Sequence, residues 1–337
     1  MSDSATVQTN KQQQAIDELE RSRVILTPGQ LVMKQFMRNK LAIVGAVVII
    51  FMILFCYVGP LFSPYGETEL FYLNTATGEE IRMSDKEGIS GNEDVILNVK
   101  SPPSREHPLG TSELGCDVLT RLMYGGRISL MVGFLVVAIE IVIGVILGCL
   151  AGYYGKWVDM LIMRMVEILN SIPFIPLMLI VSSLLISLEI QPAKKIYYTM
   201  FVLGLIYWPG VTRLVRGNVL SLREMEYMQA AEATGLKVSR KIFGHLIPNL
   251  MPLIIVIATM DLGGVIISES TMSFLGIGVA APYASWGNMV GSVTNDAVMR
   301  NCPYIWVPPG VCILLTVMAF NFVGDGLRDA FDPRMKR

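Results

Sequence analysis

The sequence predicts an all-α polytopic membrane protein with six transmembrane helices. Hydrophobic residues make up 53% of the 337 residues and charged residues only 16%, a composition typical of membrane proteins. The chain contains six apolar stretches, and crossing a bilayer takes about 20 such residues. Lysine and arginine are more frequent in the segments that this arrangement places inside the cell, as the positive-inside rule requires. Both termini are therefore expected in the cytoplasm.

The spans follow one another with connections of very different length. Residues 1–40 form a polar, glutamine-rich cytoplasmic tail, and 41–61 form the first transmembrane helix. Residues 62–127 form an extracytoplasmic insert that is acidic in its first part. Its second part predicts a short amphipathic helix around Val118 and Leu122, which ends at Gly125-Gly126. Residues 128–337 form a five-helix core with spans expected at 128–150, 172–188, 196–215, 250–275 and 304–323.

A polar, helix-prone segment, 223–248, interrupts this core between two apolar runs. One side of a first short helix would be lined by Met225, Met228, Ala231 and Ala233. Gly235 suits the end of that helix, because a left-handed backbone costs glycine nothing. Apolar residues at three- and four-residue steps predict a second helix over 238–246, and Pro248 then starts the next span. A pair of interfacial helices in a long loop would explain the same pattern.

The spacing of Ala230-Ala231, Gly235 and Pro248 resembles the EAA loop of ABC importer permeases, a cytoplasmic helix pair that docks on an ATPase. Gln229 stands where that family usually has glutamate, but the helix–turn–helix shape is retained. The resemblance implies an ATPase-coupling role for Met225, Met228, Gln229, Ala230, Ala231, Gly235 and Pro248.

Further segments extend the resemblance over 32–337. In order along the chain, LAIVGAVVIIFMILF, GYYGKWVDMLIMRMVEILNSIPF, SFLGIGVAAPYASWGNM and LLTVMAFNFVGDGLRDAFDPR are similar to the C-type permeases of dipeptide and oligopeptide importers. The resemblance implies the type I ABC importer permease fold with cytoplasmic coupling helices, in the inner (cytoplasmic) membrane. It also implies a second homologous permease, two cytoplasmic ATPase subunits that bind ATP and Mg, and an extracytoplasmic substrate-binding protein. The cargo of this family is usually a di- or oligopeptide, although close relatives carry nickel chelates, glutathione or sugars.

The sequence contains no phosphate-binding loop, nucleophile elbow or zinc-ligand spacing. Gly155-Lys156 is followed by Trp157 and is not part of a phosphate-binding loop. His107 and His245 are expected on opposite sides of the membrane, so they cannot form a metal pair. We therefore expect a non-catalytic subunit that binds no cofactor or metal of its own and no nucleic acid. Cys116 and Cys302 are both expected outside the cell, and a bridge between them is an open alternative.

Three acidic residues fall inside the predicted spans, where a charge costs about 2.5–3.5 kcal/mol on insertion scales. Glu269 matches an acidic position of the resembling family and is expected to be structural. Glu140 and Asp261 depart from the family pattern, which makes them candidates for the translocation path, although Glu140 could instead bond to a neighbouring helix. An ion-coupled secondary transporter that uses these two acids is the alternative function. A structural or insertion-factor protein without cargo is a second alternative, which no feature of the sequence supports.

Overall fold

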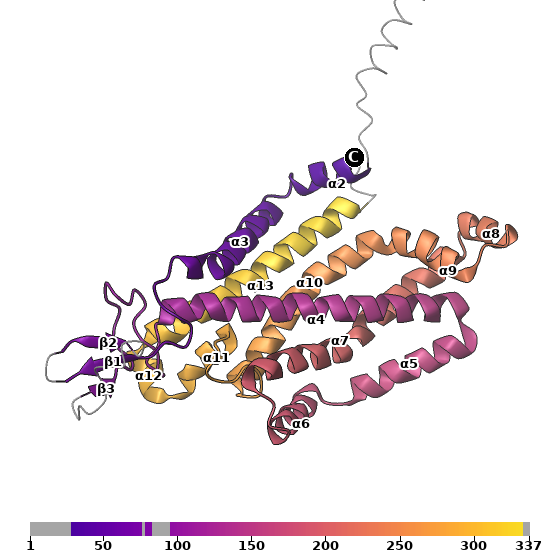
Figure 1. Ribbon diagram of the computed structural model, residues 1–337. Coiled ribbons are helices and arrows are strands. Elements are labelled where there is room, and N and C mark those ends of the chain that lie inside the picture. The colour runs from indigo at the N-terminus through magenta and orange to yellow at the C-terminus, as the bar shows by residue number, and fades with distance from the viewer. Residues whose placement is uncertain (1–27, 76–77, 83–94, 333–337) are drawn as a thin grey trace, which may run out of the picture.

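The computed structural model describes residues 28–75, 78–82 and 95–332. The helices form an elongated bundle, with the β-strands at one end and α8 and α9 at the other (Figure 1). We call these the sheet end and the coupling end. The long helices are α3 (Lys40–Tyr57), α4 (Val118–Tyr154), α5 (Lys156–Ser171), α6 (Phe174–Ser187), α7 (Pro192–Arg223), α10 (Ile247–Phe274) and α13 (Pro303–Phe331). Short helices are α2 (Pro28–Phe36), α8 (Glu226–Ala233), α9 (Val238–Lys241), α11 (Trp286–Val290), α12 (Asp296–Asn301), the 3-10 helices η1 (Gly59–Leu61) and η4 (Gly291–Thr294), and the π-helix η3 (Ile242–Leu246).

Within the described residues, four helical stretches are long and apolar enough to cross a membrane: Lys40–Leu61, Val118–Tyr154, Val238–Phe274 and Pro303–Phe331. The pair α5 and α6 would make a fifth, but its two helices are bent by 82°. The 14 residues of α6 reach about 21 Å, which is less than the ~30 Å of a hydrocarbon core. The span expected over 172–188 is therefore only the second half of a broken helix.

A seam of small residues joins α4 to α7, the helix expected as the fourth span. Gly144, Gly148 and Gly152 of α4 lie against Val211, Val215 and Val219 of α7 in three successive pairs. A Cβ atom on Gly148 would lie 2.7 Å from the Cβ of Val215 and 2.8 Å from a backbone oxygen of α7. Small residues of this kind let membrane helices approach closely. The two helices therefore pack as one rigid pair.

The prediction that a short helix ends at Gly125-Gly126 is wrong, because α4 runs without a break from Val118 to Tyr154. These glycines make room for neighbours and do not terminate the helix. A Cβ atom on Gly126 would lie 2.6 Å from the ring of Trp286, and one on Gly125 would lie 3.2 Å from the backbone of Ser285. The segment before α11 thereby packs directly on α4.

The insert between α3 and α4 also holds a small antiparallel sheet, which an all-helical prediction does not include. Its strands are β1 (Phe71–Asn74), β2 (Glu80–Arg82) and β3 (Val95–Leu97), in the order β2-β1-β3. Phe71 lies opposite Arg82, and Tyr72 lies opposite Leu97. The rest of the described chain is helical or irregular, so the helical fold class is correct for the membrane part.

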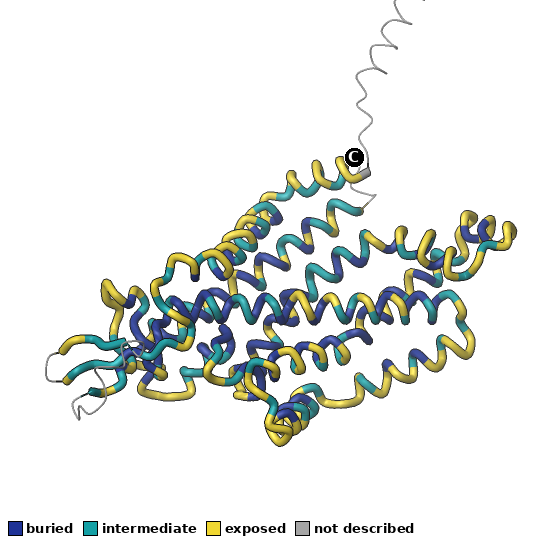
Figure 2. Tube along the Cα trace, viewed as in Figure 1, coloured by how far each residue is buried: buried dark blue, intermediate teal, exposed yellow. Residues whose placement is uncertain are grey.

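Two hydrophobic clusters fill the bundle. The sheet-end cluster includes Val137 and Leu262, and the coupling-end cluster includes Val145 and Ile257. Ile141 packs against both clusters, so they meet near the middle of α4. Buried residues follow α4 along its length, whereas α3, α5 and α6 expose much of their surface (Figure 2).

Candidate functional site

The segment 223–248 folds as the helix pair that its pattern predicts. Gly235 has φ +69°, so the left-handed turn expected there is confirmed. The amide of Leu236 donates to the carbonyl of Ala231 at 3.2 Å, and that of Gly235 donates to Glu232 at 3.0 Å. These two bonds make a Schellman motif, which satisfies carbonyl groups at the end of α8.

The two faces of α8 have different surroundings. Met228 and Ala231 are 3% and 5% exposed, and Met228 belongs to the coupling-end cluster. Met225 is 50% exposed, and Gln229 and Ala230 are also exposed. The seven residues expected to couple to an ATPase therefore divide into a buried pair that holds α8 in place and an exposed group. Gly235 and Pro248 belong to the exposed group.

Two cations fasten the helix pair to the end of α4. Arg223 donates through one guanidinium nitrogen to the carbonyls of Gly152 and Tyr153, at 3.3 and 3.2 Å. A cation is favourable at the C-terminal end of a helix, where carbonyls lack partners. Buried Lys241 lies 3.8 Å from the carboxylate of Glu232 and 5.8 Å from the ring centroid of Tyr153. The segment is thus a defined surface on a rigid base.

A cleft of about 620 Å³ opens beside the turn of this helix pair. Its lining residues are Gly235, Leu236, Lys237, Ser239, Arg240 and Phe243. Phe243 is 63% exposed, so the cleft presents a large apolar side chain between basic ones. An aromatic group with flanking cations suits contact with another protein that offers an apolar and acidic surface.

The second helix of the pair continues directly into α10. Helix α9, η3 and α10 form one helical stretch, Val238–Phe274, in which η3 is a π-turn. Pro248 lies at the start of α10, as predicted. Proline has no amide hydrogen to donate to the preceding turn, and π-turns commonly occur where the regular ladder is interrupted.

The structure brings together the two acids that the sequence selected for the translocation path. The carboxyl groups of Glu140 on α4 and Asp261 on α10 are close enough to interact directly. Glu140 is 1% exposed, and Asp261 is half-buried. In the described part of the chain, Oε1 of Glu140 has no hydrogen-bond partner. Glu140 therefore lies inside the protein rather than against lipid, beside an acid of a neighbouring helix.

Glu269 has a very different environment. Its carboxylate accepts hydrogen bonds from the hydroxyl groups of Ser129 at 2.9 Å and Ser273 at 2.7 Å. Ser129 belongs to α4, and its hydroxyl also accepts from the amide of Trp286 at 3.3 Å. These contacts tie α4, α10 and α11 together, in agreement with the structural role expected for Glu269.

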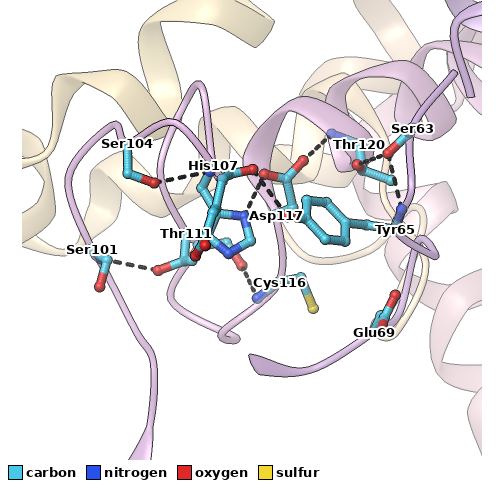
Figure 3. Close-up of polar contacts among 12 residues, drawn as sticks. Ser63, Tyr65, Glu69, Ser101, Ser104, His107, Thr111, Cys116, Asp117 and Thr120 are labelled. Atoms are coloured by element: carbon cyan, nitrogen blue, oxygen red, sulfur yellow. Dashed lines mark hydrogen bonds and ion pairs between the residues drawn. The ribbon is translucent and has the colours of Figure 1, made fainter. Parts of the chain in front are cut away.

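At the sheet end, a buried histidine joins the sheet to the first turn of α4. Figure 3 shows its contact with Asp117 in that turn. His107 Nδ1 lies 2.8 Å from Asp117, and its Nε2 lies 2.7 Å from Glu80 of β2. Asp117 also accepts from the amide of Thr120 at 2.7 Å and thereby caps α4. Burial lowers the pKa of His107, but the hydrogen bonds to Asp117 and Glu80 outweigh it and raise the pKa above its ordinary value.

The sequence did not reveal this cluster, because nothing in the pattern relates Glu80 to His107. The acidic part of the insert has a second contact with the rest of the protein. In addition to Glu80, Glu67 accepts a hydrogen bond from the amide of Ala284 at 2.8 Å, so the acidic part contacts the segment before α11. The acidic residues in 83–94 lie outside the described residues.

A second cleft, of about 470 Å³, lies at the sheet end between the insert and the segment that follows α10. Arg121, Glu113, Ser273 and Asn288 contribute polar groups to its lining. Arg121 is occupied, since it donates to the carbonyl of Pro282 at 3.1 Å. Cys116 and Cys302 are both buried and free, so the bridge left open above is not formed in this structure. Among the described residues, no group of three or more histidine, cysteine, aspartate or glutamate side chains is arranged to hold a metal ion.

Comparisons with known proteins agree with this arrangement. Residues 144–337 match the family described as binding-protein-dependent transport system inner membrane component, and 27–76 match the N-terminal transmembrane domain of oligopeptide transport permease C. The chain is 36% identical over 311 residues to the dipeptide transport system permease protein DppC of Alkalihalophilus pseudofirmus, which covers 92% of this chain and 91% of that protein. It is 37% identical over 307 residues to the dipeptide transport system permease protein DppC of Bacillus subtilis, and this match covers 90% of this chain and 85% of that protein.

A third relative is the oligopeptide transport system permease protein OppC of Haemophilus influenzae, 36% identical over 304 residues, covering 89% of this chain and 87% of that protein. The family match covers more than half of the chain, and the relatives match nearly all of it. Several helices of the described chain are long and apolar enough to cross a membrane, as an inner-membrane component requires. The chain therefore belongs to the family of inner-membrane components of binding-protein-dependent transport systems, whose members are not themselves catalytic.

Proposed function

We propose that this chain forms half of the translocation path of an ATP-driven importer for dipeptides or oligopeptides. The observation that carries the proposal is the identity of 36% or more, over about nine-tenths of the chain, to permeases named for dipeptide and oligopeptide transport. The other half of the path would be a second, homologous permease. Two cytoplasmic ATPase subunits would bind ATP and Mg, and an extracytoplasmic binding protein would deliver the peptide.

The exposed face of the segment 223–248 is the proposed ATPase contact. Met225, Gln229 and Ala230 are exposed on α8, and the cleft that contains Phe243 lies beside them. Met228 and Ala231 would support this face from behind. The proposed contact for the binding protein is the opposite end of the bundle, where the sheet, α11 and α12 lie together (Figure 1).

The proposed topology has six spans across the inner membrane, with both termini in the cytoplasm. The fourth span is α7, because α7 packs along α4 through the glycine seam and α4 is long enough to span. The third is the broken pair α5 and α6. Fusions of a reporter after residues 190 and 225 test this order, with the first expected outside the cell and the second inside. The reverse pattern at either position would rule the topology out.

Reconstitution tests the function directly. The chain should co-purify with ATPase subunits, and proteoliposomes containing the complex and its binding protein should take up labelled dialanine or pentaalanine only when ATP is supplied. Uptake that needs no ATP and instead follows an imposed proton or sodium gradient would favour the ion-coupled alternative. That alternative is tested because Glu140 and Asp261 lie together and could bind a proton or a sodium ion.

Within this function, Asp261 and Glu140 are proposed to border the path. Asp261 is half-buried and would meet a cationic group of the cargo first, with Glu140 behind it. Replacing either acid by its amide, Asp261→Asn or Glu140→Gln, should lower uptake of lysine-containing dipeptides more than uptake of dialanine. Equal loss of both cargoes would assign the acids to assembly, and no change would exclude them from cargo selection.

A further inference from the structure

The contact between Glu140 and Asp261 raises a chemical problem that the proposed function does not address. Ionised carboxylates carry only hydrogen-bond acceptors, so two of them have no donor to offer each other. Two like charges at short range in a medium of low dielectric also repel strongly. One oxygen of Glu140 is buried and has no partner among the described residues. The pair therefore lacks a positively charged or donating group.

The surrounding residues do not supply this group. Neither Glu140 nor Asp261 forms an ion pair with a lysine or arginine of the described chain. From α7, the titratable group that faces both acids is Tyr207, whose hydroxyl donates to Ser268 at 2.6 Å. Its single hydrogen is thus already used. None of the described residues therefore supplies the partner that this pair lacks.

The position of the pair adds a second observation. On α4, Glu140 lies between Val137 of the sheet-end cluster and Val145 of the coupling-end cluster. On α10, Asp261 lies in the same way between Ile257 and Leu262. The two acids therefore meet at the level where one hydrophobic cluster ends and the other begins. A carboxyl pair without a counter-charge would be strongly unfavourable there.

We infer that Glu140 and Asp261 form a proton-binding site in which the two carboxyl groups share one proton. The proton provides the donor that the contact lacks and reduces the charge of the pair from two negative charges to one. It also makes a hydrogen bond between α4 and α10 at the boundary of the two clusters. If α10 moves away from α4, the bond breaks and the proton is released to water. This site does not depend on which cargo is carried.

Infrared spectroscopy of the full chain in lipid nanodiscs tests this inference without cargo. The spectrum should contain a carbonyl band of a protonated carboxylic acid at neutral pH, which disappears as the pH is raised. In Asp261→Asn, this disappearance should shift to lower pH, because Glu140 no longer has a negative neighbour. In Glu140→Gln, the band should be lost or should shift in the same direction. Glu167→Gln, which alters an acid that is 60% exposed, should leave the titration unchanged.

A carbodiimide provides an independent reading, because it reacts with protonated carboxyl groups in apolar surroundings. Mass spectrometry should find the label on Glu140 or Asp261 at neutral pH, with loss of the label at high pH. The proposal is overturned if neither variant changes the infrared titration. It is also overturned if replacing choline chloride by sodium chloride removes both the band and the label, since the site would then hold a sodium ion.

Discussion

The turn at Gly235 allows a direct test of the coupling segment, because a substitution there strains the backbone without a clash inside the described chain. No atom of the described chain lies within 4 Å of where a Cβ on Gly235 would be, so a side chain meets no obstacle. The backbone, however, has φ +69°, a conformation that side chains disfavour. Replacement by valine therefore strains the turn without altering any packing contact.

The expected cost follows from that geometry. An L-residue in the left-handed region costs about 1–2 kcal/mol, with β-branched residues at the upper end. That energy shifts the population of the intact turn by a factor of about 5–30. Asparagine tolerates the left-handed region best among residues with a side chain. Gly235→Asn is therefore the matched control, with a similar size to valine but a smaller strain.

The assay compares ATP hydrolysis with peptide uptake in the assembled transporter. We expect Gly235→Val to assemble and to hydrolyse ATP, but to move less peptide per ATP than the unaltered protein. Gly235→Asn should remain close to the unaltered ratio. An unchanged ratio in Gly235→Val would refute the coupling role of the turn. Equal losses in the two variants would show that the added side chain, and not the backbone strain, disturbs the contact.

Three further expectations concern stability and docking. Gly148→Ala should lower the free energy of unfolding by about 1–3 kcal/mol, because the added methyl group overpacks the seam. Gly217→Ala should not, because no atom of the described chain lies within 4 Å of where its Cβ would be. Thermal unfolding in nanodiscs measures both. Folding raises the pKa of His107, so its protonated form stabilises the folded protein. This stabilisation should be full below the unfolded pKa of about 6.5 and should be lost as the pH rises through the folded pKa. The unfolding temperatures of the parent and of His107→Gln should therefore converge from pH 6 to 9. Met228→Ala should lower the free energy of unfolding by about 2–5 kcal/mol, because Met228 is buried. Met225→Ala should leave that free energy unchanged and should weaken co-purification of the ATPase. Equal destabilisation by the two substitutions would contradict the assigned faces of α8.

Local patterns predicted local structure well. The polar segment 223–248 contains two helices and the turn at Gly235, and each appears where it was expected. These features depend on residues that are close together in the chain. Arg164 and Glu167 lie three residues apart, a spacing that brings side chains together on a helix, and they form an ion pair at 2.6 Å. The prediction that Met225, Met228, Ala231 and Ala233 line one side of α8 is correct only for Met228 and Ala231, which are buried. Met225 and Ala233 are exposed, because only the middle of this short helix packs on the coupling-end cluster.

Long-range contacts were harder to predict, for a physical reason. Gly125 and Gly126 suit either the end of a helix or a close helix contact, and only the position of Trp286 decides between these. Glu80, His107 and Asp117 come together because a strand folds back onto the start of α4. The sequence identified Glu140 and Asp261 as unusual, but it could not show that they face each other, since the packing of α4 on α10 determines that contact.

The coupling segment is connected to the membrane part by two routes of different geometry. On one side, α8 follows α7 after a short turn, and α7 is held along its length by the glycine seam with α4. On the other side, α9 continues through the π-turn into α10. The first route is thus tightly packed against α4, whereas the second leads through an irregular turn, Ile242–Leu246, whose Ile242 and Leu246 are buried in the coupling-end cluster. Helix α10 carries Asp261 and Glu269, so movement at the coupling end would act first on the acid pair and then on the serine-bound carboxylate at the sheet end.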